Sequence, residues 1–335
     1  MTINTVMLQV IKNSVAQHLL TPGTTTIQCI LITIGLFVAL KFLLRELLCT
    51  ARWLFTQKRD LLQRYGENSY VVVTGSTGGI GKALAIAFAK RGFNIISISR
   101  NPKKLEKTEK EILQANPKIN VQSIQTDFSK ASDLSIFEDI HSKIERLDIS
   151  ILINNVGIDS LLQFKDSSPQ FLKDMIFINV LSTVIMTRTL LPKLRNRKKM
   201  SGVINISSSA GSVPASYFTT YCGTKAFMDM LGASLRKENR GLVDFMTVKP
   251  FEVSTDMTGN KGADLRTITA EQCANAVLED FTRGVHRTAG HWNHKLQSWM
   301  VETLPEWFFD LVWENHMAEQ FYKDRGIKGY KPLGQ

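Results

Sequence analysis

The chain has 335 residues, of which 44% are hydrophobic, and its formal net charge is +11. The length fits one large domain with extensions at both ends better than two domains, and the apolar content is ample for a core. The charge favours contact with anionic groups such as lipid headgroups or acidic acyl carriers, but no nucleic-acid-binding motif accompanies it, so nucleic acid is not an expected partner.

An apolar segment near the start of the chain is long enough to cross a bilayer. Thr24–Leu40 contains no charged residue, and beyond Lys41 and Arg45 the apolar run continues to Leu48. About 20 apolar residues span a membrane, and basic side chains at the end of a span reach the interface. The segment lies too far into the chain for a cleaved signal peptide and lacks a small-residue cleavage site. We therefore expect residues 1–50 to form an N-terminal tail and a transmembrane anchor. A hydrophobic docking helix that does not cross is the alternative.

Basic residues gather on one side of this segment. Only Lys12 precedes it, and residues 51–67 read as a basic linker after it. Positive residues favour the cytosolic side, so the rest of the chain should face the cytosol. The basic residues on the C-terminal side of the uncharged stretch Thr24–Leu40 are Lys41, Arg45, Arg52, Lys58, Arg59 and Arg64.

A glycine-rich turn joins an expected strand to an expected helix. Tyr70–Val73 is an apolar β-branched run, and Thr74–Gly81 follows it with the sequence Thr-Gly-Ser-Thr-Gly-Gly-Ile-Gly. Apolar residues then recur at helical spacing over 82–91. Gly75 permits a tight turn, and Gly79 lets the backbone approach a pyrophosphate at the helix N-terminus. Strand, glycine turn and helix predict a dinucleotide site.

Two further polar motifs follow apolar strands. Asn154-Asn155-Val156-Gly157 comes directly after Ile149–Ile153, where parallel sheets bind ligands. Ser208 follows the next apolar strand and lies thirteen residues before Tyr221. A hydroxyl at the end of that strand can then face a tyrosine on the next helix.

Tyr221 and Lys225 are spaced to share one face of a helix. A free tyrosine titrates near pH ~10 and is a poor acid at neutral pH. A neighbouring cation favours the phenolate and lowers the pKa of a tyrosine. The pair is therefore a candidate for acid–base catalysis.

Taken together, these motifs resemble the short-chain dehydrogenase/reductase family in order and spacing, over roughly residues 68–295. The resemblance implies a Rossmann-like, doubly wound parallel α/β sheet in that region as an NADP-binding catalytic domain. It implies a catalytic tetrad of Asn179, Ser208, Tyr221 and Lys225, with Asn179 holding a water between Lys225 and bulk solvent. The cofactor contacts expected from the motifs are Gly75, Ser76, Thr77, Gly79, Ile80, Gly81, Arg100, Asp127, Asn154, Tyr221, Lys225, Val253 and Thr255.

The cofactor preference is expected to be NADP(H). The strand expected after the first helix ends with Asn94–Arg100, and at this strand end NAD sites usually carry an acid that binds the ribose hydroxyls. An arginine there suits the 2′-phosphate of NADP, and Lys103 and Lys104 add positive charge. A solvated loop arginine is the alternative. By resemblance, Asp127 contacts the adenine.

A subgroup resemblance bears on the substrate. Pro250-Phe251-x-Val253-x-Thr255 is similar to the membrane-bound subgroup that holds 17-beta-hydroxysteroid dehydrogenases and very-long-chain 3-oxoacyl-CoA reductases. Phe251 stands where the wider family has glycine. Phe218 and Phe251 either line an apolar pocket or lie in the core.

Two peripheral regions stay open to several interpretations. The basic cluster of residues 193–199 should lie at the sheet edge away from the cofactor, as a solvated face. Residues 296–335 form an aromatic C-terminal extension, and Trp299–Trp313 is its richest part. That part either lies in the membrane interface, folds over the substrate cleft, or packs on the domain or on a second subunit of a homodimer.

The sequence thus predicts a membrane-anchored, NADPH-dependent reductase of a ketone on a lipid substrate, a steroid or a 3-oxoacyl-CoA, in the endoplasmic reticulum membrane. A retinol or other carbonyl reductase of the same family is one alternative, and a catalytically silent NADP-binding membrane scaffold is another. The four cysteines suit a reducing compartment and lack metal-ligand spacing, so no metal is expected. They are Cys29, Cys49, Cys222 and Cys273.

Overall fold

A computed structural model describes residues 22–159, 161–259, 262–305 and 307–308. The chain divides into two compact units between Gln57 and Lys58. In the first unit, the residues that the structure describes form one long helix, α2 (Pro22–Phe55). Within it Gln28–Leu44 is an apolar stretch. Most of the large apolar side chains described between Ile30 and Leu48 are more than half exposed, and Phe42 is partly buried.

Among the described residues, one helical stretch is long and apolar enough to cross a membrane, and it is Pro169–Arg195. It comprises α7 (Pro169–Ile176), the π-helical turn η3 (Phe177–Leu181) and α8 (Ser182–Arg195). Met186, Leu190 and Leu194 of α8 are buried against the sheet. Packing in the core of the second unit therefore accounts for the apolar character of this stretch.

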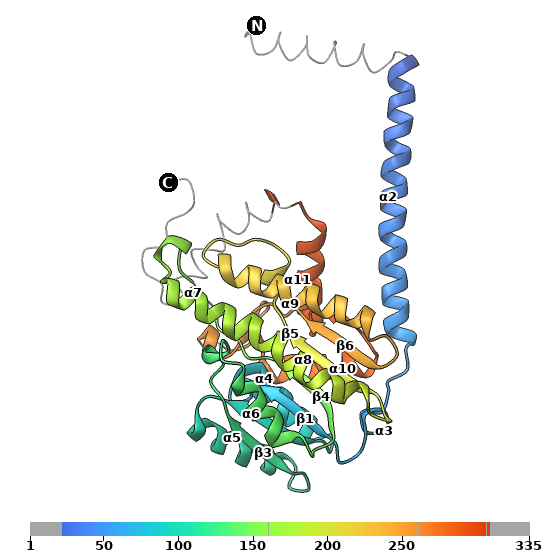
Figure 1. The fold of residues 1–335 in the computed structure, drawn as a ribbon. Helices are drawn as coiled ribbons and strands as arrows, with labels where there is room; N and C mark the ends of the chain where they lie inside the picture. Colours follow the sequence, from blue (N-terminus) through green and yellow to red (C-terminus); the bar gives the residue numbers. More distant parts are fainter. Residues whose placement is uncertain (1–21, 160, 260–261, 306, 309–335) are drawn as a thin grey trace. The chain divides into compact units, whose positions relative to one another are not determined.

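The second unit is built on a seven-stranded sheet in the order β3-β2-β1-β4-β5-β6-β9 (Figure 1). Every pairing in it is parallel. Strands buried on both faces read as near-continuous apolar runs, as Val71–Val73 does. The predicted Rossmann-like, doubly wound sheet is confirmed. Its strands are β1 (Tyr70–Thr74), β2 (Asn94–Ser99), β3 (Val121–Gln125), β4 (Ile149–Asn154), β5 (Ser201–Ile206), β6 (Val243–Val248) and β9 (Arg287–Thr288).

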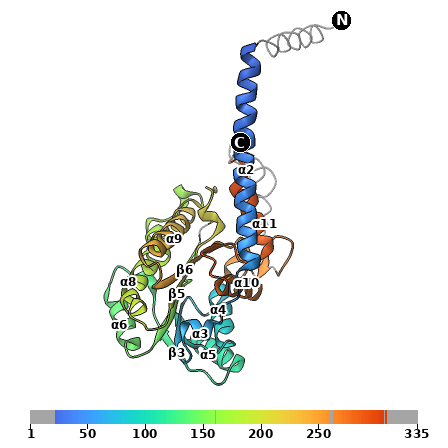
Figure 2. The same ribbon diagram turned by 90° about the vertical axis from the view of Figure 1, so that its right-hand side faces the viewer.

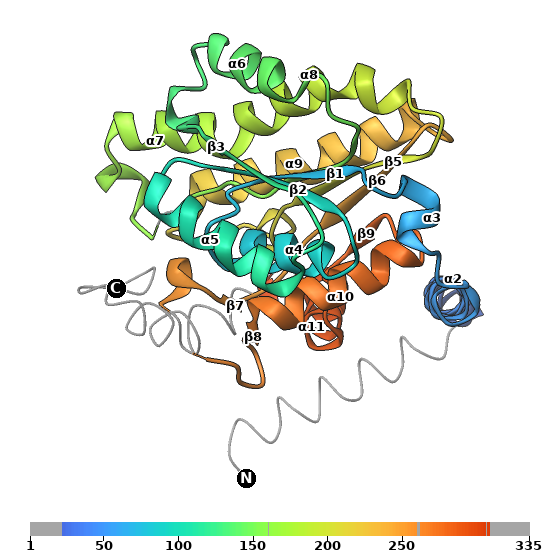
Figure 3. The same cartoon turned by 90° about the horizontal axis from the view of Figure 1, so that it is seen from below.

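Helices cover both faces of the sheet (Figures 2 and 3). Alternate residues of β1 serve opposite faces, because Val71 and Val73 belong to one buried cluster and Val72 to the other. The first cluster lies under α3 (Leu61–Tyr65), α4 (Gly79–Ala89), α5 (Pro102–Ala115) and α10 (Ala270–Thr282). The second lies under α6 (Ser135–Ile144), α8 and α9 (Thr219–Glu238).

Short elements at the carboxyl ends of the strands complete the unit. A two-stranded sheet pairs β7 (Val253–Ser254) with β8 (Ile268–Thr269), and α11 (Trp292–Thr303) follows β9. These elements, rather than the main sheet, form the outer wall of the site described below. The remaining single turns are η1 (Phe128–Lys130), η2 (Phe164–Asp166), η4 (Ser209–Gly211) and η5 (Asp256–Thr258).

The expected basic linker of residues 51–67 is only partly a linker. Tyr65 of α3 is fully buried, and its ring stacks on Phe281 of α10 with centroids 5.1 Å apart. Lys58 pairs with Glu279 at 2.9 Å, and Arg64 with Asp244 at 2.8 Å. Residues from Lys58 onward therefore belong to the second unit, because an aromatic core contact and ion pairs fix them there.

The expectation of a solvated face for the basic cluster is wrong for its central member. The Arg197 side chain is 8% exposed, and its guanidinium binds Asp148 at 2.7 Å and the main-chain oxygens of Tyr65 and Met200, each at 2.6 Å. It joins the starts of β4 and β5 to α3, at the edge of the sheet opposite the glycine turn. Lys199 is exposed as expected.

Candidate active site

The glycine turn between β1 and α4 has the geometry of a phosphate cradle. Gly75 and Gly79 have φ values of 65° and 51°, a region that side chains other than glycine rarely adopt. A Cβ on Gly81 would lie 2.5 Å from the Gly75 oxygen, so close packing excludes any side chain there. Gly78, the N-cap residue of α4, makes no side-chain capping bond. The first amides of α4 are thereby left to bind an anion.

Asn155 holds this turn against the end of β4. Its Nδ2 donates to the oxygens of Thr74 and Gly75 at 3.0 and 3.1 Å. Its main-chain N–H donates to Thr74 Oγ1 at 3.0 Å. Asn155 and Gly157 line the cavity next to the turn. Sequence reasoning singled out the first asparagine of the pair and missed the second.

Asn154 does not reach the cavity, which corrects its expected cofactor contact. Its side chain is 1% exposed, and its Nδ2 donates to Thr187 Oγ1 and Asn205 Oδ1, both at 2.9 Å. As the last residue of β4 it points into the layer between the sheet and α8. Successive side chains of an extended chain point to opposite sides, so the Asn154 side chain points into the protein and Asn155 lines the cleft.

Ser76 and Thr77 support the turn from behind. Ser76 is fully buried, and its Oγ lies 2.6 Å from Ser97 Oγ, so its side chain faces β2 and not the cavity. Thr77 Oγ1 lies 2.8 Å from Ser99 Oγ, at the edge of a second cavity of about 500 Å³. Ile80 lines the main cavity. Of these three predicted contacts, the structure brings only the Ile80 side chain to that cavity.

Arg100 and Asp127 lie at the ends of neighbouring strands. Arg100 is exposed directly after β2, and its oxygen accepts from Gln125 at 3.3 Å. Asp127 is partly buried and its Oδ1 accepts from Ser129 N at 3.1 Å, which caps η1. Neither residue lines the main cavity. Lys104 forms an ion pair with Asp256 at 3.6 Å.

Tyr221 and Lys225 meet on α9 as their spacing predicts. The Lys225 Nζ lies 5.5 Å from the centre of the Tyr221 ring and donates to the Ile206 oxygen at 3.0 Å. Lys225 is 4% exposed, and burial lowers the pKa of its ammonium to about 8, while the negative charge of Asp159 opposes that shift. Ser207 Oγ donates to the Lys225 oxygen at 2.7 Å and fixes this turn of α9 to β5.

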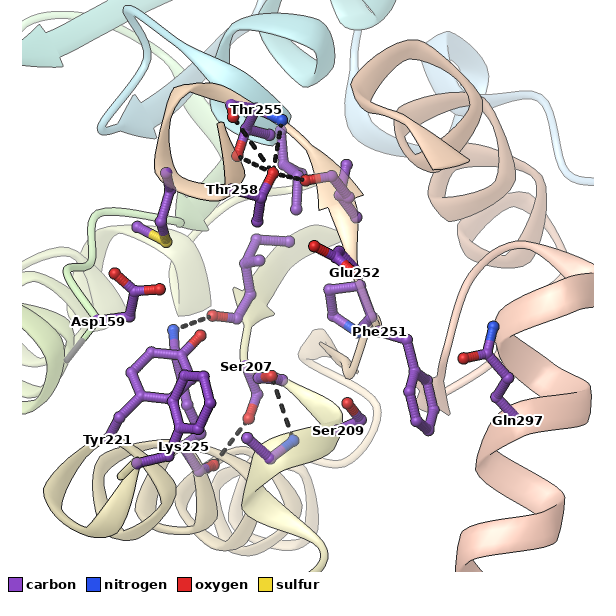
Figure 4. Close-up of a pocket in the computed structure, with 18 of the residues that line it drawn as sticks. Asp159, Ser207, Ser209, Tyr221, Lys225, Phe251, Glu252, Thr255, Thr258 and Gln297 are labelled. Carbon is purple, nitrogen blue, oxygen red and sulfur yellow. Dashed lines mark hydrogen bonds between the residues drawn. The ribbon is translucent and has the colours of Figure 1, made fainter. Parts of the chain in front are cut away.

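Ser208 follows β5 and lines the same cavity as Tyr221 and Lys225. Its Oγ accepts from Ala210 N at 3.2 Å, which caps η4 and fixes the serine rotamer. Figure 4 shows Tyr221, Lys225 and Asp159 at one end of the cavity and Phe251 and Gln297 toward the other.

Asn179 lies one layer behind the cavity, in the π-helical turn η3. It is fully buried, and its Oδ1 accepts from Ile158 N at 2.8 Å. Its Nδ2 donates to the Ile158 oxygen at 2.8 Å and to Thr224 Oγ1 at 3.1 Å. The amide therefore clamps the loop after β4 to α9. Single π-helical turns within α-helices are common at functional sites.

Val253 and Thr255 line the cavity from the segment after β6, between the glycine turn and Tyr221. The Thr255 N–H donates to Thr258 Oγ1 at 2.9 Å, and Thr258 Oγ1 donates to the Val253 oxygen. A Cβ on Gly79 would lie 2.9 Å from Thr255 Cγ2, so this segment packs directly on the turn.

The cavity has a volume of about 720 Å³ and continues from the glycine turn past Tyr221 to α11. A nicotinamide dinucleotide fits this set of residues, because the side-chain-free cradle at Gly78 and Gly79 and the tyrosine line one continuous space. Its far wall is largely apolar. The apolar residues lining it are Val213, Ala215, Phe218, Phe251, Leu265, Leu296, Met300, Val301, Leu304 and Phe308.

Helix α11 is fixed to the domain by buried polar contacts. Lys249 is 2% exposed, and its Nζ lies 3.4 Å from Asp229 Oδ2 and 3.5 Å from Glu302 Oε1. His294 Nδ1 accepts from Phe251 N at 3.2 Å, and burial lowers the pKa of His294 to about 4, which keeps it neutral as an acceptor. The described part of the aromatic extension thus lines the cleft, whereas residues 309–335 lie outside the described residues.

A parallel sheet of this order, with a glycine turn between β1 and α4, defines a Rossmann-like dinucleotide-binding domain. Residues 69–266 match the family model described as short chain dehydrogenase. The chain therefore belongs to the short-chain dehydrogenase/reductase family, and it is an oxidoreductase.

Curated relatives and a solved structure agree with this assignment. The chain is 34% identical to a 17-beta-hydroxysteroid dehydrogenase type 3 of Danio rerio, over 76% of this chain and 83% of the relative. It is 34% identical to a very-long-chain 3-oxoacyl-CoA reductase of Caenorhabditis elegans, over 76% and 81%. A short-chain dehydrogenase from Sphingobium yanoikuyae in complex with NADPH is 25% identical, with a TM-score of 0.59 over 66% and 87%. The predicted family and subgroup are confirmed.

The two asparagines give a direct test of the corrected site. Asn155→Ala removes two hydrogen bonds that hold the glycine turn and should weaken NADPH binding about tenfold, since each bond contributes about 0.5–1.5 kcal/mol. Asn154→Ala should instead lower the free energy of unfolding by about 1–3 kcal/mol with little change in NADPH affinity. Calorimetric titration and thermal unfolding of both variants measure the two effects. Equal losses of NADPH affinity would contradict the assignment.

Proposed function

We propose that this chain is a membrane-anchored, NADPH-dependent reductase of a ketone on a lipid substrate. One observation carries the proposal: Ser208, Tyr221 and Lys225 line the same cavity as the glycine turn, and the far wall of that cavity is largely apolar. A ketone bound there would lie within reach of a hydroxyl, a phenol and a dinucleotide at once.

Tyr221 is the proton donor in this proposal. When bound, NADPH supplies the hydride that reduces the carbonyl carbon. Tyr221 gives its phenolic proton to the carbonyl oxygen, and Ser208 donates a hydrogen bond to the same oxygen. The contact between Ser208 and Ala210 supports this role because it keeps the hydroxyl at the cavity wall.

Lys225 has two roles in this proposal, one toward Tyr221 and one toward the cofactor. Its positive charge beside the ring favours the phenolate that remains after proton transfer. Its position under the loop after β4 suits a contact with the nicotinamide ribose. The pKa of about 8 leaves most Lys225 side chains charged at neutral pH. The ammonium is lost as the pH rises through that value, so reduction should decline in alkaline solution.

For Asn179 the geometry supports a positioning role more directly than the water-holding role that the resemblance implies. Its Oδ1 and Nδ2 atoms already bind Ile158 and Thr224. The side chain thereby keeps the loop that carries Gly157 and Asp159 against Lys225.

Selectivity for NADP over NAD is proposed from Arg100. It follows β2, at the place where an acidic residue would bind the ribose of NAD, and an arginine binds the 2′-phosphate through charge-assisted hydrogen bonds. Lys103 is exposed nearby in α5 and adds positive charge. The Gly79 region would hold the pyrophosphate, and Val253 and Thr255 would orient the nicotinamide amide. Asp127 would contact the adenine.

The substrate class is proposed from the apolar wall and from the relatives. Both a steroid and a very-long 3-oxoacyl chain are largely apolar, and relatives named for each are equally similar to this chain at 34% identity. A retinol or other carbonyl reductase uses the same machinery and stays as an alternative. A silent scaffold is disfavoured because all four residues of the tetrad are present.

Membrane attachment is proposed through α2. Its outward-facing apolar residues suit a bilayer, and an endoplasmic reticulum location with a cytosolic catalytic unit follows the subgroup and the basic flank. Lys58, Arg59 and Arg64 pair with acidic residues of the domain. The orientation signal therefore depends on Lys41, Arg45 and Arg52.

Tyr221→Phe removes the acidic proton and keeps the ring. Turnover of a 17-ketosteroid and of a 3-oxoacyl-CoA, each assayed with NADPH in membrane fractions, should fall by about 100- to 10,000-fold for whichever the wild type reduces. NADPH affinity should be nearly unchanged. Wild-type rates in the variant would remove Tyr221 from the mechanism, and a wild type inactive on both ketones would favour the scaffold or another carbonyl substrate.

Arg100→Asp should weaken NADPH binding by at least tenfold and spare or improve NADH binding. It replaces a charge-assisted bond to the 2′-phosphate with repulsion, and it restores an acid for the ribose hydroxyls. Titration of both cofactors measures this. Lys118→Asp, an exposed change between α5 and β3, is the charge-matched control. A parallel change in both affinities for Arg100→Asp would exclude Arg100 as the discriminator.

Deletion of residues 1–50 should release the protein from membranes at least in part. In intact vesicles, added protease should digest the catalytic unit of the full-length chain. Protection until detergent is added would reverse the proposed orientation. Retention of the deleted form on membranes would shift attachment to the exposed aromatic residues Trp292, Trp299 and Trp307.

A further inference from the structure

A carboxylate faces the catalytic pair from outside the tetrad. Asp159 lies in the loop after β4 and lines the main cavity together with Tyr221 and Lys225. In Figure 4 its side chain lies at the same end of the cavity as those two residues, across from Phe251 and Gln297. Asp159 lies two residues beyond Gly157, the last residue of the Asn-Asn-x-Gly motif.

The position of this loop is fixed closely. Asn179 binds both the N–H and the oxygen of Ile158, each at 2.8 Å. A Cβ on Gly157 would lie 3.5 Å from Lys225 Nζ and 3.3 Å from Asn179 Oδ1. Residue 157 therefore packs on the ammonium and residue 158 is clamped. Asp159, the next residue, is held beside the same group.

Two other carboxylates, those of Asp229 and Glu252, belong to elements around Lys225. On its own helix, Asp229 pairs with Lys249 at 3.4 Å and with Arg287. Glu252 enters the cavity from the segment after β6. The influences on the Lys225 ammonium are its burial, which disfavours the charge, and Asp159, which favours it.

A negative charge at this place has the same effect on both members of the pair. It stabilises the protonated, cationic lysine, and it disfavours the anionic form of a neighbouring phenol. Carbonyl reduction needs the phenol protonated at the start of the cycle. The charge of Asp159 thereby raises the pH up to which Tyr221 stays protonated and can act as the proton donor.

We propose that Asp159 is a positioning residue that keeps Tyr221 and Lys225 protonated and so sets the upper limit of the pH range in which the enzyme reduces ketones. This inference rests on the proposed function, since it assigns the regulation of the same site. The inference concerns the protonation state of Tyr221 and Lys225, two interacting groups that titrate as a unit. It does not concern a contact between Asp159 and the substrate.

Asp159→Asn tests the proposal, because it removes the charge and keeps the shape. The alkaline limb of kcat for ketone reduction with NADPH should move down by about one pH unit, the lower end of the effect of a charge within ~4–6 Å. At pH values above this decline, turnover should be about tenfold lower than that of the wild type. At lower pH, turnover and KM should stay close to the wild-type values. Asp159→Glu should restore the limb. Glu252→Gln, which removes a carboxylate from another wall of the cavity, should leave the limb in place.

A second measurement does not need turnover. The phenolate absorbance of Tyr221, taken as the difference between the protein and its Tyr221→Phe variant, should appear at lower pH in Asp159→Asn. Equal losses of activity at all pH values, or an unmoved phenolate titration, would overturn the proposal. If the wild type reduces neither ketone, the proposed function fails on its own, and the absorbance titration still decides the role of Asp159.

Discussion

The site depends on a lysine ammonium that is almost completely buried. Lys225 is 4% exposed, and it is held by the Ile206 oxygen below the Tyr221 ring. Burying an ammonium is unfavourable unless hydrogen bonds and charges compensate it. Here the compensation comes from the end of β5 and from Asp159, and the same environment brings the pKa of the lysine to about 8. A group poised near neutrality can serve a neighbouring acid in a way that a solvated lysine cannot.

The fold supplies this environment at the carboxyl edge of the parallel sheet. The glycine turn, the loop after β4 and the serine after β5 all end at this edge, so residues far apart in the chain meet in one cavity. The π-helical turn brings Asn179 against Ile158, and the Asn155 amide ties the glycine turn to β4. Both side-chain amides bind main-chain atoms of the loops, which fixes the loop backbones directly.

The spacing of residues close together in the sequence was enough to predict those parts of the site that lie within one helix or one turn. The i, i+4 pair Tyr221 and Lys225 and the glycine turn follow from helix and turn geometry alone. The burial of Asn154 could not be read from the motif, because strand alternation is visible only once the register of β4 is known. The role of Asp159 likewise depends on the Asn179 clamp, which joins residues far apart in sequence. In the sequence Arg197 is one of several neighbouring basic residues. Only the fold brings it to Asp148, just before β4, and to Tyr65 of α3.

The proposed function depends above all on hydride transfer to a ketone in the cavity that Tyr221 lines. The most direct measurement uses NADPH that carries deuterium at both hydrogen positions of the reactive nicotinamide carbon, with membranes that contain the full-length chain and either a 17-ketosteroid or a 3-oxoacyl-CoA. Mass spectrometry of the product alcohol should find one deuterium on the carbinol carbon, and the Tyr221→Phe protein should give almost none. An unlabelled alcohol, or equal labelling by the variant, would contradict the account.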